Sequence, residues 1–264
     1  MVDGRWTMDD GRWTMDETMA EPTAAVMKPE AAPTAAVWED FVDIFYAPSH
    51  VFARRQNGSF WIPMLVVTIL VGTVYFLTSG AMQPIMDAEF NRQAAAAMRK
   101  NPQINAEAME RFRHIAGRVG QVAAFVTVPV IIAMIGTTLW LVGKLFDARQ
   151  AFKAAMIVAA YSCVPKVIEA VSNGLQALML DPSLLNGPFR VSLGVGRFID
   201  PDTASPIVLA LVGRMNVFTI WVTILLAIGL SVTGKIPRRR AAIAAAIVWI
   251  LGALPMIFQA LRSM

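Results

Sequence analysis

Five long apolar stretches constrain what this chain can fold into more than any other feature. They cover residues 60–79, 122–142, 154–180, 215–232 and 241–261. A helix that crosses a bilayer needs about 20 mostly apolar residues, and shorter spans of about 17 occur. The composition agrees, because 56% of the residues are hydrophobic and only 16% are charged, whereas soluble domains carry about 25% charged residues. The sequence therefore predicts an all-α, polytopic transmembrane helix bundle of five spans and argues against a soluble enzyme.

The first 37 residues differ from the rest of the chain. They hold few aliphatic side chains, many Ala, Pro, Asp and Glu residues, and two tandem repeats. Asp3–Asp9 recurs as Asp10–Asp16, and Pro22–Val26 recurs as Pro33–Val37. Neither repeat has the length of a solenoid unit, and such a composition buries too little apolar surface to order a chain. Residues 1–37 are therefore predicted to be a disordered low-complexity tail, followed by a membrane domain over residues 38–264.

An aromatic segment, residues 38–56, precedes the first span. Trp38, Phe41, Val42 and Phe45 have the i, i+3, i+4, i+7 spacing of one helix face, whereas the acidic residues beside them fall on other sides. The helix is predicted to break at Pro48. Two interpretations remain open: an amphipathic helix lying in the membrane interface, or a helix docked on the protein's own surface.

The segment between the first two spans, Gly80–Arg118, is long enough to fold outside the membrane. A proline restricts the residue before it to extended conformations, so Asn101-Pro102 predicts two helices with a break between them. The result is a helical extramembrane loop between spans 1 and 2.

Five spans place the two termini on opposite sides of the membrane. Basic residues next to spans favour the cytoplasmic side. Arg54 and Arg55 lie just before span 1, and the dense run Lys235–Arg240 lies between spans 4 and 5. We therefore expect a multi-pass protein of the cell membrane, most simply a bacterial cytoplasmic membrane, with the N-terminus cytoplasmic and the C-terminus outside.

No motif of a known catalytic or cofactor site is present. The chain has one cysteine, Cys163, and two histidines, and it lacks nucleophile-elbow, zincin and phosphate-loop sequences. Its basic residues are scattered among the spans, without a nucleic-acid-binding motif. The sequence predicts a non-enzymatic protein with no catalytic residues, no cofactor, no metal site and no nucleic-acid partner.

The third span carries the ionisable residues that lie deepest in a membrane segment. Lys166, Glu169 and Asn173 are three and four residues apart, so they share one helix face. Charges in a membrane usually face the bundle interior or a wet cavity. Three interpretations remain open: a pathway for an ion or small solute, an internal ion pair that fixes packing, or a span that ends early. Arg214 and Asn216, at the mouth of span 4, are the nearest candidates for a matching polar patch; Arg214 is expected to extend to the surface.

Two short motifs suggest a family. The third span contains Tyr161, Ser162 and Pro165 in the order Tyr-Ser-x-x-Pro, and the fourth contains Phe218 and Trp221 followed by Gly229. Their order within five spans, after a tail and an aromatic segment ending in paired arginines, resembles the bacterial branch of the Yip-one (Ypt-interacting protein) family. The resemblance implies an all-helical membrane domain with a cytosolic tail. Eukaryotic members of that family act in vesicle trafficking and contact Rab GTPases, a role that does not transfer to a bacterial chain.

Two functions of different classes remain at this point. The first is a membrane-organising scaffold that acts through helix–helix contacts, with the lipid bilayer, other membrane proteins or further copies of itself as its partners. The second is a component of a small-solute or ion transporter or channel that uses Lys166, Glu169 and Asn173.

Overall fold

The computed structural model describes residues 6–9, 11–15, 36–101 and 106–263. It divides into two units, Met1–Val37 and Trp38–Met264, and each is treated by itself.

The first unit contains a short β-hairpin. Strands β1 (Trp6–Asp9) and β2 (Arg12–Met15) pair antiparallel, with Trp6 opposite Met15 and Met8 opposite Trp13. The duplicated heptapeptide supplies both strands, and its Trp and Thr residues favour β-structure. Gly11, with φ of 77°, lies between them, where an Asp-Gly sequence favours a tight turn. Most of the rest of the expected tail lies outside the described residues.

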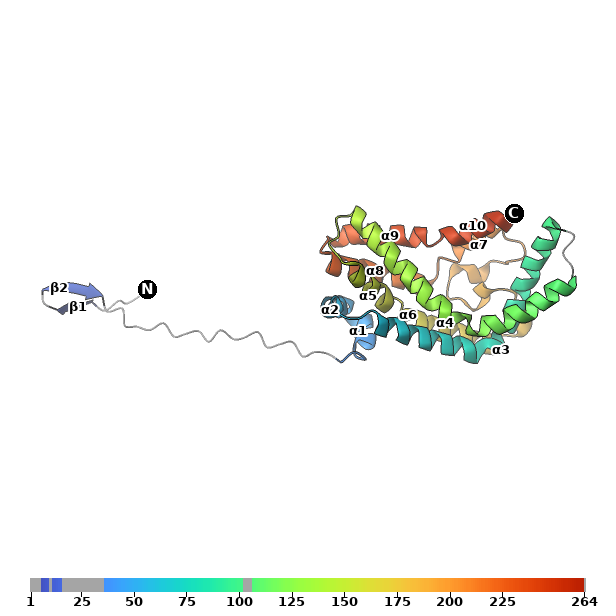
Figure 1. Ribbon diagram of the computed structural model, residues 1–264, viewed down its shortest axis with the longest axis horizontal. Coiled ribbons are helices and arrows are strands. Elements are labelled where there is room, and N and C mark those ends of the chain that lie inside the picture. The colour runs from blue at the N-terminus through green and yellow to red at the C-terminus, as the bar shows by residue number, and fades with distance from the viewer. Residues whose placement is uncertain (1–5, 10, 16–35, 102–105, 264) are drawn as a thin grey trace. The chain divides into compact units, whose positions relative to one another are not determined.

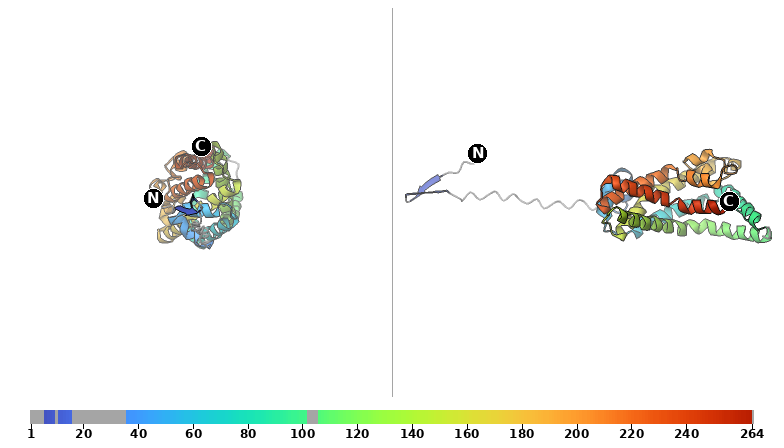
Figure 2. Two further views of the ribbon diagram at one scale, coloured as in Figure 1. Left: turned by 90° about the vertical axis from the view of Figure 1, so that its left-hand side faces the viewer. Right: turned by 90° about the horizontal axis from the view of Figure 1, so that it is seen from above.

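The second unit is a helical bundle, shown in Figures 1 and 2. Its helices are α1 (Asp40–Tyr46), α2 (Pro48–Arg55), α3 (Trp61–Lys100), α4 (Ala106–Leu145), α5 (Phe152–Ser162), α6 (Pro165–Met179), α7 (Pro206–Val212), α8 (Val217–Gly234), α9 (Arg238–Leu251) and α10 (Leu254–Ser263). Three 3₁₀ helices lie between α6 and α7: η1 (Pro182–Leu184), η2 (Pro188–Val191) and η3 (Val195–Phe198).

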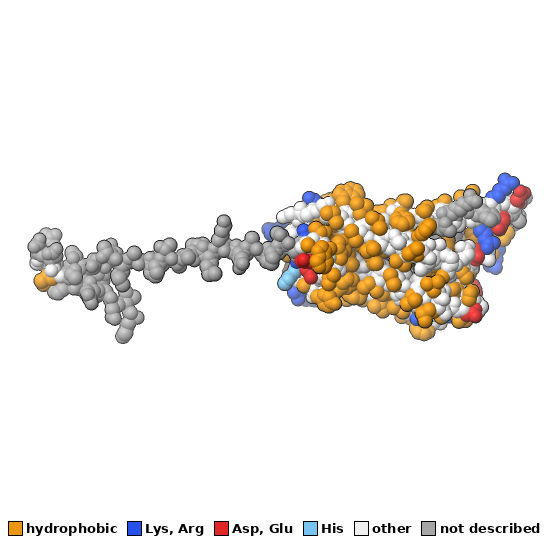
Figure 3. Space-filling model, turned by 90° about the horizontal axis from the view of Figure 1, so that it is seen from below, with side chains coloured by type: hydrophobic (Ala, Val, Ile, Leu, Met, Phe, Trp, Pro, Cys, Tyr) orange, Lys and Arg blue, Asp and Glu red, His pale blue; other side chains and the backbone are white. Residues whose placement is uncertain are grey.

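Five helical segments are long and apolar enough to cross a membrane, as the sequence predicted. They are Trp61–Thr78, Val122–Leu145, Phe152–Met179, Val217–Gly234 and Arg238–Leu261. Span 4 begins at Val217 rather than 215, because Asn216 caps α8 by accepting a hydrogen bond from the Phe218 backbone. On the face drawn in Figure 3, hydrophobic side chains cover the middle of the unit and charged side chains gather at its two ends, which suits a bilayer-spanning protein.

Two of the spans consist of two helices each. Span 3 is interrupted between α5 and α6 at Cys163–Val164, directly before Pro165, because proline lacks the N–H that would continue the helix. Span 5 is interrupted at Gly252–Ala253, between α9 and α10.

Span 3 forms the centre of the bundle. Helix α5 packs against α4, α8, α3, α1 and α2, and every residue from Ala154 to Ser162 is buried. The small side chains of this stretch allow close helix packing.

The segment between spans 1 and 2 is helical, but its helices are not separate from the spans. Helices α3 and α4 have 40 residues each, which at 1.5 Å per residue is about 60 Å, twice the hydrocarbon thickness of about 30 Å. Their outer halves form two arms, separated at the predicted break after Lys100, and joined by an ion pair of 2.8 Å between Arg113 and Asp87. We call this end of the bundle the arm end and the opposite end, where α1 and α2 lie, the cap end (Figure 1).

Candidate functional site

The predicted polar face of span 3 lies near the arm end. Counting 1.5 Å per residue from Phe152, Lys166 is about 21 Å and Glu169 about 26 Å along the span, whose apolar core is about 30 Å thick. Span 3 continues beyond both residues to Met179, so the two charges lie in the half of this span that is closer to the arms.

Lys166 and Glu169 belong to a hydrogen-bonded cluster that draws on three parts of the chain. Lys166 Nζ lies 2.6 Å from Glu169 Oε2 and 3.2 Å from Thr219 Oγ1. Asn216 Nδ2 donates to Glu169 Oε1 at 3.0 Å and to Ser192 Oγ at 3.1 Å. We call Lys166, Glu169, Ser192, Asn216 and Thr219 the span-3 cluster; in it the charged groups of span 3 compensate one another and tie α6 to the start of α8.

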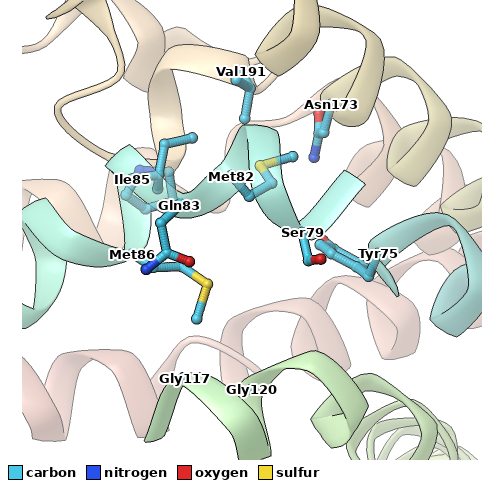
Figure 4. A pocket seen from close by; sticks show the side chains of 11 residues that line it. Tyr75, Ser79, Met82, Gln83, Ile85, Met86, Gly117, Gly120, Asn173 and Val191 are labelled. Carbon is cyan, nitrogen blue, oxygen red and sulfur yellow. The ribbon is translucent and has the colours of Figure 1, made fainter. Parts of the chain in front are cut away.

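Asn173, the third predicted residue, does not join that cluster. It lines a separate pocket of about 200 Å³ between the arms, α6 and η2 (Figure 4). Its Oδ1 is buried and has no hydrogen-bond partner among the described residues. The predicted face of three residues is thus divided between an ion pair and a pocket.

A second polar cluster, which the sequence did not predict, holds the cap. Asp40 has no exposed surface, and its carboxylate accepts hydrogen bonds from Arg54 Nε at 2.7 Å, Arg55 Nε at 2.6 Å and Tyr161 Oη at 3.1 Å. Asp43 adds a second ion pair to Arg54. We call Asp40, Asp43, Arg54, Arg55 and Tyr161 the cap cluster; it joins α1 and α2 to span 3.

In the cap cluster, burial and the neighbouring carboxylates act in opposite directions on the pKa of Arg54. Burial lowers the pKa of Arg54, but its hydrogen bonds to Asp43 and Asp40 outweigh this, so the pKa of the guanidinium is raised on balance. Arg54 stays charged at every physiological pH, which the buried Asp40 carboxylate needs.

The cap is docked on the protein's own helices, as one of the two interpretations of residues 38–56 expected. Ile44, Val51 and Phe52 are fully buried, and α2 packs on α8. The predicted aromatic face is wrong in part. Phe41 and Phe45 face the bundle, whereas Trp38 and Val42 are exposed. The reason is that the buried face of α1 is centred on Asp40 and Ile44.

The sequence pattern that defines the Yip1 domain matches residues 42–258, from α1 to α10. This chain belongs to the Yip1 family. A curated relative, "Membrane protein YknW" of Bacillus subtilis (strain 168), is 24% identical over 210 residues, which cover 78% of this chain and 83% of the relative. No solved structure matches the chain. The relative is bacterial, in agreement with the branch that the motifs suggested.

The Yip1-like motif residues meet the cap. Tyr161 binds Asp40 and lies 5.7 Å from the ring of Phe41. Trp221 packs edge-on against Phe45, with ring centroids 5.3 Å apart. A Cβ on Gly229 would collide with Val158 and come within 3.2 Å of Phe52, so the glycine lets α8 approach both α5 and α2.

The other motif residues shape the helices themselves. Pro165 begins α6 at the break in span 3. Ser162, just before that break, is fully buried, and its Oγ has no partner among the described residues. Phe218 is buried in the first turn of α8.

The position of the Arg214 side chain differs from the expectation that it extends to the surface. Instead of extending to the surface, its Nη2 donates to the Trp249 carbonyl at 3.0 Å, and its guanidinium lies 5.8 Å from the centre of the Trp249 ring. That carbonyl precedes the break in span 5, where Ala253 bonds to Ile250 instead. Burial lowers the pKa of Arg214, and its Nε has no partner in the part of the chain that the structure describes.

Proposed function

We propose that this Yip1-family protein is a non-enzymatic membrane-organising protein that binds other membrane proteins, or further copies of itself, through its cap. In this proposal the protein resides in the cell membrane with the cap and tail in the cytoplasm. The basic residues of the cap and of the Lys235–Arg240 segment, which connects α8 to the first turn of α9, support that orientation.

The observation that carries the proposal is an exposed apolar stripe on an anchored cap. Trp38, Val42 and Tyr46 are four residues apart and are 69%, 51% and 84% exposed. Val42 and Tyr46 share a face of α1, Trp38 lies in the turn that precedes the helix, and exposed apolar surface of this kind marks an interaction site. The cap cluster fixes the opposite side of α1, so the stripe is presented by a rigid element rather than by a mobile segment.

The transport alternative has weaker support. A pathway needs polar groups that water can reach along its length, but Lys166 and Glu169 are paired with each other and with span 4. The stretch of span 3 toward the cap, Ala154–Ser162, is buried throughout.

Site-specific photocrosslinking in native membranes tests the proposal. A benzophenone amino acid would replace Trp38, Val42 or Tyr46, and His50, which is exposed on α2 of the same cap, would serve as the matched control. We expect protein adducts of defined mass from the three stripe positions and none from position 50. Adducts with lipid alone would place the stripe in the membrane interface and contradict the proposal.

A further inference from the structure

Two connections between helices at the cap end lie side by side (Figure 1). The first joins α4 to α5 and the second joins α8 to α9. The Arg149 backbone N–H of the first donates to the Gly234 carbonyl of the second at 3.0 Å. Gly234 permits this approach, because a Cβ placed on it would lie 3.0 Å from the Cβ of Ala148. Residues that are distant in sequence are thereby combined into one surface.

That surface carries far more positive than negative charge. Residues 144–151 and 235–240 include one carboxylate, Asp147, which lies 3.7 Å from Arg240 and whose side chain is 89% exposed. The same two ranges include six cations, all of them exposed: Lys144, Arg149, Lys235, Arg238, Arg239 and Arg240. Apart from Arg240, none of them makes an ion pair with a carboxylate of the described residues. We call Asp147 and these six cations the basic rim.

The basic rim lies at the level where the spans leave the membrane. Lys144 is in the last turn of span 2, and Arg238–Arg240 form the first turn of span 5. Exposed apolar side chains follow directly on the same helices, with Leu141 and Leu145 on α4 and Ile243 on α9. A phospholipid whose acyl chains lie against these apolar residues therefore places its headgroup among the cations.

The backbone of the basic rim is unusual at two of its charged residues. In the part of the chain that the structure describes, the non-glycine residues with positive φ are Asp147, at 61°, and Lys235, at 53°. Glycine and asparagine adopt this left-handed conformation readily, whereas it is unfavourable for a lysine. Backbone strain of this kind is concentrated at functional sites. The positive charge of Lys235, rather than its backbone preference, therefore accounts for a lysine at this position.

From this arrangement we propose that the basic rim binds the headgroup phosphates of anionic phospholipids, such as phosphatidylglycerol, in the leaflet on the cap side. Anionic lipids attract each lysine and arginine near the membrane surface. The exposed apolar residues that adjoin the cations favour a lipid over a soluble acidic protein as the partner. The proposal does not depend on the exposed stripe of Trp38, Val42 and Tyr46, or on the partner proposed for it.

Photoactivatable lipids test the proposal on the full chain in vesicles. Phosphatidylglycerol and phosphatidylcholine analogues, each with a diazirine near the headgroup end of one acyl chain, would be crosslinked and their adducts mapped. The phosphatidylglycerol preference is the ratio of labelling by the two analogues at residues 141–152, divided by the same ratio at residues 126–134 in the middle of span 2. We expect this preference in the wild type. Equal labelling of residues 141–152 by both analogues would overturn the proposal, and if soluble polyglutamate blocked that labelling the rim would be assigned to an acidic protein instead.

Lys235→Asn removes one charge and supplies a residue that suits the left-handed backbone. Loss of one cation should lower the phosphatidylglycerol preference about fivefold, whereas the matched control Lys235→Arg should keep it. The unfolding midpoint of Lys235→Asn in a neutral detergent should be unchanged or raised, because the strain is relieved. A lowered midpoint with an unchanged lipid preference would assign the charge to the dipole at the C-terminus of α8 and overturn the proposal.

Asp147→Asn provides a variant with the opposite expected result. Asparagine also adopts positive φ, so the backbone of the connection is kept while the carboxylate beside Arg240 is removed. The phosphatidylglycerol preference should then rise about fivefold, a gain that a merely structural role of these connections would not produce. An unchanged or lowered preference in Asp147→Asn would contradict the binding of anionic headgroups by the basic rim.

Discussion

Replacing Asp40 by Asn should undock the cap. The Asp40 carboxylate is fully buried and accepts three hydrogen bonds, two of them from arginines. Removing one partner of a buried ion pair costs about 3–5 kcal/mol. The side chains of Arg54 and Arg55 are 30% and 26% exposed, so water recovers part of this, and we expect a loss of about 2–4 kcal/mol in docking free energy.

Asp43→Asn is the matched control. Asp43 lies on the same helix and pairs with the same Arg54, but its side chain is 39% exposed. Exposed pairs contribute about 0–1 kcal/mol. The two variants should therefore differ by about 2 kcal/mol, or about 30-fold in the population of undocked cap.

Trypsin cleavage after Arg54 and Arg55, in vesicles with the cap outward, measures that population, because slow cleavage follows the fraction of open molecules. The exposed arginines Arg238, Arg239 and Arg240, in the first turn of α9 at the same end of the bundle, supply an internal standard. We expect cleavage at the cap to accelerate about 30-fold more in Asp40→Asn than in Asp43→Asn. Equal rates in the two variants would refute the assignment of Asp40 as the anchor of the cap.

Three further predictions concern helix packing, the span-3 cluster and the cap cluster. Gly229→Val should destabilise the protein by about 1–3 kcal/mol, since any Cβ there collides with Val158; an unchanged denaturation midpoint in mild detergent would contradict it. Glu169→Leu alone should lower the midpoint, because it leaves Lys166 without its carboxylate partner, whereas Lys166→Met combined with Glu169→Leu should recover most of the loss; a double variant as unstable as the single one would count against mutual compensation. Tyr161→Phe should cost about 1.5–3 kcal/mol, since it deletes a hydrogen bond to a charged group, and a cap cleavage rate like that of the wild type would show that the hydroxyl is dispensable.

The membrane architecture could be predicted from the sequence because it depends on local hydropathy. All five spans were located, and the break before Pro165 follows from the missing proline N–H. The continuation of α3 far beyond the membrane was harder to predict, because a helix that leaves the bilayer changes composition without an obvious stop signal.

The polar contacts were harder to predict because their partners are distant in sequence. Asp40 is separated from Tyr161 by 121 positions. An amphipathic pattern predicts that an aspartate faces solvent, because the pattern contains no information about partners that are distant in sequence. Likewise the spacing of Lys166 and Glu169 predicted their pairing, but not the bond from Asn216, which depends on how span 4 packs on span 3. The sequence alone marks Asn216 only as a polar residue at the mouth of span 4.

The most direct test of whether the protein acts through its cap rather than through a polar path is the access of water to span 3. Single cysteines at positions 162, 166, 169 and 173, in a Cys163→Ala background, would be treated with a membrane-impermeant thiol reagent from each side of sealed vesicles. The closed span-3 cluster and the buried residues Ala154–Ser162 predict no labelling of positions 162, 166 and 169 from the cap side, and reaction at 173 from the arm side only. Labelling of 162, 166 and 169 from both sides would reveal a continuous wet path and contradict this account.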